Sequence, residues 1–338
     1  MKRNGNAVIY LVILVLCSCA KSNSGGNPST NTLDIYVAGT DLSGSHAIAK
    51  YWKNGTAVPL SDGTANAHAL SIAVTGNDVY VAGYVTRGTN DLASYWKNGS
   101  LVVLGDTDSQ ASAITISGGD VYIAGFENDG TYFVPKYWKN GQAVKLSDDT
   151  RDGWANAIAV SGTDVYVAGY EATSYWTAEY WKNGTPVILS PAKIDAVAFS
   201  IAVSGADVYV AGVQLNGGNW VAKYWKNGSP VILADGPYQA YAFSLAVSGN
   251  DVYVAGYTTS DSAKTAYYWK NDSTTSLVSN ANGALASSIA LSGTDVYVAG
   301  NELMGNVWTA KYWKNGSPVI LSAPSKSEFA NSIFLVSH

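Results

Sequence analysis

The sequence predicts an all-β protein built from seven copies of one four-stranded unit, and three observations carry this prediction. Tyr, Trp and Gly are abundant, at 23, 11 and 34 of 338 residues, which favours strands and turns. Variants of Asp-Val-Tyr-Val-Ala-Gly recur at steps of 42–44 residues, starting at Asp34, Asp78, Asp120, Asp164, Asp207, Asp251 and Asp295. Variants of Tyr-Trp-Lys-Asn-Gly recur with the same period, starting at Tyr51, Tyr95, Tyr137, Tyr180, Tyr224, Tyr268 and Tyr312. Four-stranded units at this period are typical of β-propeller blades, so we predict a seven-bladed β-propeller.

Each unit contains four strand-like runs, called a, b, c and d in chain order. Strand a resembles Ser-Ile-Ala-Val, b is Asp-Val-Tyr-Val-Ala-Gly, c is Ala-Lys-Tyr-Trp-Lys, and d is a short apolar run. Asn-Gly between c and d suits a two-residue type I′ turn because both residues accept positive φ. The runs therefore predict an antiparallel meander. One copy has Asn271-Asp272 instead of Asn-Gly, and we expect this hairpin to be the weakest of the seven.

The two ends of the repeat array predict how the ring closes. The first copy begins directly at strand b with Asp34, and the chain ends with a strand a that has no following partner, residues 332–337. We expect this C-terminal strand to pair with the N-terminal blade, which removes exposed sheet edges. Residues 34–338 then form one seven-bladed propeller domain.

The N-terminal segment has the pattern of a bacterial export signal. Lys2 and Arg3 precede an apolar run over 7–17, too short for a stable membrane span. Leu16-Cys17-Ser18-Cys19 resembles the lipobox of bacterial lipoproteins. The resemblance implies a signal peptide over 1–18, lipidation of Cys19, and a flexible Gly/Ser/Asn-rich tether within 19–33. The alternative is an ordinary cleaved signal.

We therefore expect a membrane partner through the N-terminal lipid. The implied location is the cell envelope, with anchoring at the outer membrane. Whether the protein faces the periplasm or the cell surface stays open.

Composition excludes several chemistries. The chain carries 20 Lys and Arg against 25 Asp and Glu, which disfavours nucleic acid as a partner. Both cysteines, Cys17 and Cys19, lie in the N-terminal segment, and the three histidines lack metal-ligand spacing. We expect no metal and no cofactor.

The repeated residues have a structural interpretation. Strands inside a blade are covered on both sides, so the repeated Tyr and Trp are expected to form the core. The repeated Asp and Lys flank the short turns and lie on one rim, where the Asp is expected to bind backbone N–H groups of the turn.

Function is expected where the copies differ, on the face that carries the longer b–c and d–a connections. One variable position precedes a repeated Ala in strand a and holds His68, Gln110, Trp154, Val197, Tyr241, Leu285 and Phe329. If strand a is innermost, these residues ring the mouth of the central channel. A second variable position, five residues before the Trp of strand c, holds Ala47, Asp91, Phe133, Trp176, Trp220, Lys264 and Trp308.

From these two positions we select a set of candidate ligand-binding residues: His68, Gln110, Trp154, Tyr241, Phe329, Trp176, Trp220 and Trp308. The alternative is that they are plugs beneath the d–a loops or part of the packing between blades.

The sequence shows no catalytic constellation. A glycosidase needs two carboxylates about 5–9.5 Å apart. The acids of the variable face are scattered in sequence, with no spacing that selects a pair: Asp62, Asp91, Glu127, Asp129, Asp148, Asp149, Asp152, Glu171, Asp195 and Glu302. Neither a Gly-x-Ser-x-Gly elbow nor a glycine-rich phosphate loop occurs. We assign no catalytic residues and expect a protein that is not an enzyme.

The combined motif, Ser-Gly-x-Asp-Val-Tyr-Val-Ala-Gly followed by Ala-Lys-Tyr-Trp-Lys-Asn-Gly, resembles the uncharacterised repeat propellers of bacterial lipoproteins, particularly those of Bacteroidetes. The resemblance implies a propeller and an envelope location, but no activity. The expected function is a lipid-anchored, non-catalytic protein-interaction or scaffold module. The alternative is a lectin-like module that binds glycans through aromatic residues of the variable face, and a hydrolase is a remote alternative. The expected partner is an unidentified protein or glycan.

Overall fold

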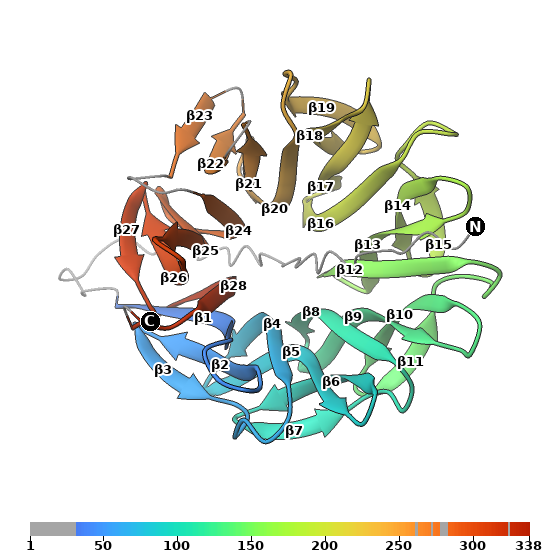
Figure 1. Cartoon of the computed structure of the whole chain (residues 1–338). Coiled ribbons are helices and arrows are strands. Elements are labelled where there is room, and N and C mark those ends of the chain that lie inside the picture. Colours follow the sequence, from blue (N-terminus) through green and yellow to red (C-terminus); the bar gives the residue numbers. More distant parts are fainter. Residues whose placement is uncertain (1–31, 261–262, 272, 278–282, 324) are drawn as a thin grey trace, which may run out of the picture.

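Seven four-stranded antiparallel sheets are arranged around a central axis (Figure 1). The computed structural model describes residues 32–260, 263–271, 273–277, 283–323 and 325–338. The predicted seven-bladed β-propeller is confirmed. Blade 1 consists of β28 and β1–β3, and blades 2 to 7 follow along the chain from β4–β7 to β24–β27.

The four strand types keep the same order in every blade. The a strands are β4 (Ala67–Thr75), β8 (Ser109–Ser117), β12 (Asp152–Ser161), β16 (Ala196–Ser204), β20 (Ala240–Ser248), β24 (Ala284–Ser292) and β28 (Glu328–Ser337). The b strands are β1 (Leu33–Asp41), β5 (Asp78–Arg87), β9 (Asp120–Asn128), β13 (Asp164–Ala172), β17 (Asp207–Asn216), β21 (Asp251–Thr259) and β25 (Asp295–Met304). The c strands are β2 (Ile48–Lys53), β6 (Asn90–Lys97), β10 (Phe133–Lys139), β14 (Trp176–Lys182), β18 (Asn219–Lys226), β22 (Lys264–Lys270) and β26 (Val307–Lys314). The d strands are β3 (Thr56–Pro59), β7 (Ser100–Val103), β11 (Gln142–Lys145), β15 (Thr185–Ile188), β19 (Ser229–Ala234), β23 (Ser273–Ser276) and β27 (Ser317–Ile320).

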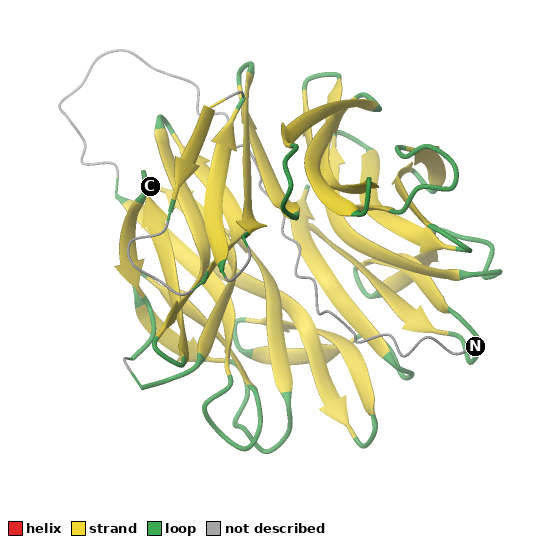
Figure 2. Ribbon diagram, turned by 45° about the horizontal axis from the view of Figure 1, so that its top comes forward, coloured by secondary structure: helices red, strands yellow, loops and turns green. Residues whose placement is uncertain are grey.

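The ring closes as the sequence predicts. The C-terminal β28 pairs antiparallel with β1, with Ile333 opposite Val37 and Phe334 opposite Tyr36. Neighbouring a strands contact one another around the whole circle, so they form the innermost layer (Figure 1). Figure 2 shows the twisted sheets from a second direction, with loops gathered at the two ends of the strands.

A bulge interrupts every a strand, and it explains the last glycine of the repeated Asp-Val-Tyr-Val-Ala-Gly. In blade 4 the register of β12 with β13 shifts between Ala155 and Ala157. A Cβ on Gly169 would lie 1.9 Å from the carbonyl oxygen of Trp154. At the equivalent glycines, an added Cβ would lie 1.8–2.1 Å from the corresponding carbonyl oxygen of strand a. These glycines are Gly39, Gly83, Gly125, Gly212, Gly256 and Gly300. Only glycine fits where the bulge brings backbone against backbone.

Two of the three repeated aromatic residues form the core as predicted, whereas the Tyr that precedes the Trp of strand c is half-buried in every blade. The Trp of strand c is 0–3% exposed in all seven blades, and the Tyr of strand b is 3–8% exposed. Each of these side chains lies between two blades, where its area is removed from water on both faces of the sheet.

A ring of serines links neighbouring a strands. The backbone N–H of Ile333 donates to Ser288 Oγ at 3.1 Å, and Ile72 donates to Ser332 Oγ at the same distance. Ile114, Leu245 and Ile289 make the same bond to the preceding blade. Blades 3 and 4 carry Ala113 and Ala157 at this serine position, so the hydroxyl acceptor is missing there.

The short-turn face repeats one polar motif in every blade. In blade 2, Asn98 and Gly99 have φ of 51° and 83°, which confirms the predicted type I′ turn. The prediction that the Asp binds backbone N–H groups is wrong: Asp78 accepts from the side chains of Asn98 and Lys97, at 2.7 and 3.0 Å. Asn98 Oδ1 instead accepts the N–H of Val79. Asn can do both because its amide is donor and acceptor at once.

Some predictions fall on residues that are not described. The signal peptide over 1–18 and the lipidated Cys19 lie outside the described residues, and so does Asp272 of the turn expected to be weakest. None of the residues that the structure describes forms a helix with the length and hydropathy needed to span a bilayer.

Candidate functional site

The b–c and d–a connections lie together on the face opposite the short turns. The prediction that the b–c connections are longer than the a–b and c–d turns is wrong in three blades. In blades 2, 5 and 7 the b–c connection is only two residues, 88–89, 217–218 and 305–306. The variation of this face therefore comes mainly from the d–a connections and from the ends of the strands themselves.

Six aromatic side chains form a continuous series across blades 3, 4 and 5, which we call the aromatic array: Phe126, Phe133, Trp154, Tyr170, Trp176 and Trp220. Phe126 meets Phe133 edge-on at a centroid distance of 5.4 Å, and Trp154 contacts both. Trp154 stacks on Tyr170 at 4.9 Å. Trp176 stacks on Trp220 at 6.0 Å across the boundary between blades 4 and 5. The array thus joins three of the eight predicted candidates, Trp154, Trp176 and Trp220.

Part of this array faces solvent. Trp176 is 41% exposed, and the neighbouring Tyr175 is 40% exposed. The backbone N–H of Trp176 donates to Asp195 Oδ1 at 2.8 Å, and that of Phe133 donates to Asp152 Oδ1 at 2.9 Å. Each of these carboxylates belongs to the following blade, so it fixes the start of a c strand against its neighbour. The array is therefore a partly exposed apolar surface held by rigid strands.

The other five candidates lie apart from the array. His68 stacks on Tyr84 at 4.7 Å, and burial lowers the pKa of the imidazole below its usual 6.5. Tyr241 stacks on Tyr257 at 4.9 Å, and its hydroxyl donates to Gln239 Oε1. The remaining three are Phe329, which packs on Trp308 at 5.7 Å, Trp308 itself, and Gln110, which donates to Ser112.

The residues of the first variable position do lie on the innermost strands, but each of them is buried or half-buried. Packing against strand b of their own blade, as in the stacking of His68 on Tyr84 and of Tyr241 on Tyr257, therefore accounts for much of their burial.

The scattered acids of this face each have a partner. Glu127 pairs with Lys136, Glu302 with Lys311, Asp149 with Lys145, and Glu171 with Arg151 at 3.6 Å. Asp62, Asp91, Asp129 and Asp148 bind hydroxyl or backbone donors of their own loops. Asp152 and Asp195 hold the c strands described above. These acids therefore serve loop and interface geometry.

One carboxylate that the sequence analysis did not select behaves differently. Glu179 on β14 is 2% exposed, and its Oε1 has no hydrogen-bond partner among the described residues. Burial and the neighbouring Glu171 raise the pKa of Glu179 from 4.5 to about 8, with Arg151 acting in the opposite direction. Burial also raises the pKa of Glu171. In the pairing of β13 with β14, Glu171 and Glu179 are diagonal neighbours, so two carboxylates lie on adjacent strands of blade 4.

The sequence contains signals that could have found the missed residues. Phe126 and Tyr170 follow directly after the repeated glycine of strand b, a position that also holds Tyr84 and Tyr257. Glu179 stands where four other copies have lysine, as Ala-Glu-Tyr-Trp-Lys against Ala-Lys-Tyr-Trp-Lys. Within the described ranges, no three His, Cys, Asp or Glu side chains are grouped so that they could hold a metal ion.

Comparison with known proteins supports the fold. No family model matches the chain, and no curated protein matches it. Among solved structures it is similar to the β-propeller domain of the Trilobed protease from Pyrococcus furiosus, with a TM-score of 0.52 over 94% of this chain and 98% of that chain. The two sequences are 10% identical, so the likeness shows the fold alone. That domain is described as having an open velcro topology, whereas here β28 pairs with β1 and closes the ring.

Proposed function

We propose that this protein is a non-catalytic glycan-binding module of the bacterial envelope, anchored by lipid on Cys19. The observation that carries the proposal is the aromatic array, which spans three blades and leaves Trp176 41% exposed. The faces of sugar rings present C–H groups that pack on aromatic rings, while their hydroxyls need polar partners nearby. Arg151 and Glu171 supply such partners beside Trp154 and Tyr170 in sequence.

The lipid anchor and the envelope location rest on the lipobox-like Leu16-Cys17-Ser18-Cys19 and on the resemblance of the repeats to propellers of Bacteroidetes lipoproteins. A rigid ring on a flexible tether suits a module that holds a glycan near the membrane. Mass spectrometry of the protein purified from bacterial membranes tests this part. Diacylated or triacylated Cys19 at the mature N-terminus is the expected result, and an unmodified N-terminus after another residue removes the anchor.

A non-catalytic role fits the acids of the variable face. The ten scattered acids are engaged in loops and interfaces, and Glu179 is only 2% exposed. A hydrolase needs two accessible carboxylates on either side of the bond.

The test is a glycan-array screen of the full-length protein and of Trp176→Ala with Trp220→Ala. We expect selective binding that the double variant loses while its circular dichroism and melting temperature stay close to those of the wild type. Trp308→Ala, on the other side of the ring, is the matched control and should keep the binding. An array on which the wild type binds no glycan would remove this function.

A second candidate, a protein-interaction module, is favoured by the outer rim. Ile188, Ile232 and Ile320 occupy the same position of three d strands and are 55–56% exposed. The prolines two residues earlier remove a backbone donor from each edge, which limits strand pairing but leaves a flat apolar contact available. A photo-reactive residue at Ile232 should crosslink one partner in intact cells, whereas the same probe at Asn98 should not. Identical products at both positions would eliminate this candidate.

A further inference from the structure

One position of strand c can be compared across the seven blades. Two residues before the Trp of strand c, four blades carry a lysine: Lys50, Lys136, Lys223 and Lys311. Each lysine reaches the residue that lies two positions after the repeated glycine of strand b. In blades 1, 3 and 7 that residue is an acid, and in blade 5 it is Gln214, whose Oε1 lies 3.0 Å from Lys223 Nζ.

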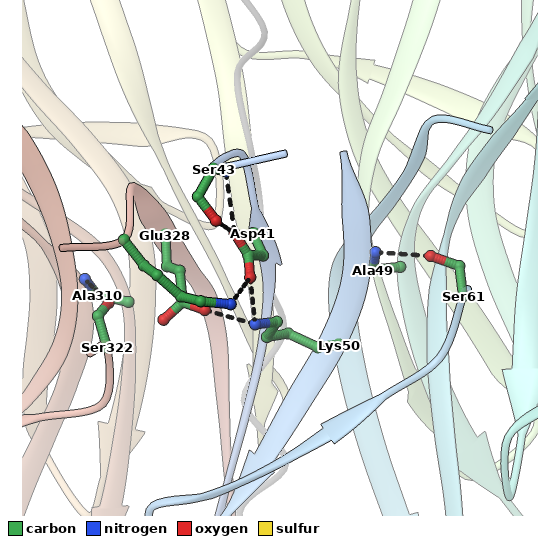
Figure 3. Close-up of polar contacts among 9 residues, drawn as sticks. Asp41, Ser43, Ala49, Lys50, Ser61, Ala310, Ser322 and Glu328 are labelled. Atoms are coloured by element: carbon green, nitrogen blue, oxygen red, sulfur yellow. Dashed lines mark hydrogen bonds and ion pairs between the residues drawn. The ribbon is translucent and has the colours of Figure 1, made fainter. Parts of the chain in front are cut away.

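Blade 1 shows the arrangement with the ammonium in place (Figure 3). Lys50 Nζ lies 3.0 Å from Asp41 Oδ2 and 2.5 Å from Glu328 Oε1, and all three side chains are buried. In blade 7 the Lys311–Glu302 pair is even more enclosed, with both side chains 3% exposed. This position of strand c therefore accommodates a buried ammonium group beside an acid of the neighbouring strand.

Blade 4 has the acid but not the ammonium. Glu171 occupies the position of Glu127 and Glu302, and Glu179 occupies the position of the lysine. A glutamate places its oxygens one bond closer to the backbone than a lysine places its Nζ. The site thus holds two carboxylates around a position where other blades hold a positive charge, and Glu179 Oε1 is left without a partner. A buried carboxylate in this state is costly unless a cation or a proton compensates it.

This site adjoins the aromatic array. The residue opposite Glu171 on β12 is Gly153, and a Cβ on Gly153 would lie 3.4 Å from the side chain of Glu171. A Cβ on Gly153 would lie 2.8 Å from Pro135 of blade 3, which is itself opposite Phe126. The two carboxylates and the array therefore meet at the boundary between blades 3 and 4. Glu171, with 16% of its side chain exposed, is the more exposed of the two carboxylates.

We infer that Glu171 and Glu179 form a subsite for an ammonium group carried by the ligand, the free amino group of an amino sugar whose ring packs on the aromatic array. This inference rests on the proposed glycan-binding function and names its substrate class. The ammonium takes the place that Lys136 Nζ and Lys311 Nζ fill in their own blades, and Arg151 yields its contact with Glu171 to the ligand. Aromatic rings beside the carboxylates add cation–π attraction to the ion pair.

The experiment compares two ligands of equal length, a glucosamine tetramer and its fully N-acetylated counterpart, by calorimetric titration of the full-length protein. The wild type should bind the free amine at least about tenfold more tightly, a difference of about 1.4 kcal/mol. Glu179→Lys copies the residue of blades 3 and 7, so it supplies an internal ammonium and should fold. It should lose the preference for the amine while keeping the affinity for the acetylated tetramer. Glu179→Gln should lose part of the preference.

The outcomes separate the two proposals. Equal binding of both tetramers by the wild type overturns the amine subsite and leaves glycan binding standing. Binding of neither tetramer, together with a silent glycan array, overturns both. An amine preference that persists in Glu179→Lys assigns the preference to another acid and also overturns the subsite. A higher melting temperature of Glu179→Lys than of the wild type shows that the introduced lysine pairs with Glu171, which validates the variant.

Discussion

The two faces of the ring are made of the same seven copies, yet they differ in how far the copies agree. On the short-turn face every blade repeats one Asp–Lys ion pair at 2.8–3.0 Å. On the opposite face, the first variable position holds His, Gln, Trp, Val, Tyr, Leu and Phe in turn, and in strand c of blade 4 Glu179 replaces a lysine. Residues that recur show what each blade needs in order to fold. Departures from the repeat show where one blade does something that the others do not.

The largest expected contrast lies within one strand of blade 4. Trp181→Ala should lower the free energy of unfolding by roughly 3–5 kcal/mol because Trp181 is 1% exposed and its loss leaves a cavity. Trp176→Ala, five residues earlier and 41% exposed, should change it by about 0.5 kcal/mol or less while weakening glycan binding. Urea denaturation of both variants measures the difference. Equal losses at the two positions would mean that the array is core and not a binding surface.

The second contrast is the pH dependence of blade 4. Because the folded-state pKa of Glu179 is about 8 against 4.5 for a free glutamate, the native state holds more protons than the unfolded state between these values. The contribution of Glu179 to the free energy of unfolding should therefore be most favourable below about pH 4.5. It should be lost as the pH rises from there through 8. Each pKa unit corresponds to about 1.4 kcal/mol, so the full loss is a few kcal/mol.

Glu179→Gln should abolish most of this decline, and its denaturation midpoint at pH 9 should exceed that of the wild type. The charged groups that act on Glu179 are Glu171, which raises its pKa, and Arg151, which lowers it. Glu171→Gln should lower the pKa of Glu179, so the free energy of unfolding at pH 8 should be higher than in the wild type. The decline with pH should become smaller but remain. Parallel pH profiles of wild type and Glu179→Gln would contradict the assignment.

The sequence predicted the fold but only part of the site, for a physical reason. The period of the repeats, the Asn-Gly turns and the two incomplete ends determine the blade and its closure, because strands a to d pair within one copy. The aromatic array depends on contacts between copies, such as Phe133 with Trp154 and Trp176 with Trp220. Spacing along one chain does not give the distance between neighbouring blades. Motif spacing does not select Glu179, because its role depends on the absence of a lysine that other copies possess.

A smaller effect is expected in the repeated turns. Asn98→Ala should cost about 1–2 kcal/mol, because Asn98 has a φ of 51° that alanine accepts poorly and its Oδ1 binds the N–H of Val79. Lys97→Ala is the control in the same turn. Its ion pair with Asp78 is exposed and screened by salt, so the variant should melt almost with the wild type. A larger loss for Lys97→Ala than for Asn98→Ala would show that the ion pair, and not the Asn side chain, fixes this face.

The smallest effect concerns the ring of serines, whose acceptor is missing in the two blades that hold most of the aromatic array. Ala157→Ser should place a hydroxyl beside the N–H of Ile201 and raise the free energy of unfolding by about 1 kcal/mol, with slower hydrogen exchange at that amide. Ser288→Ala, which removes the acceptor for Ile333, should have the opposite sign. If Ala157→Ser also leaves glycan binding unchanged, the inner ring only supports the array. If the added hydrogen bond in Ala157→Ser abolishes binding, blades 4 and 5 must move apart for a ligand to enter.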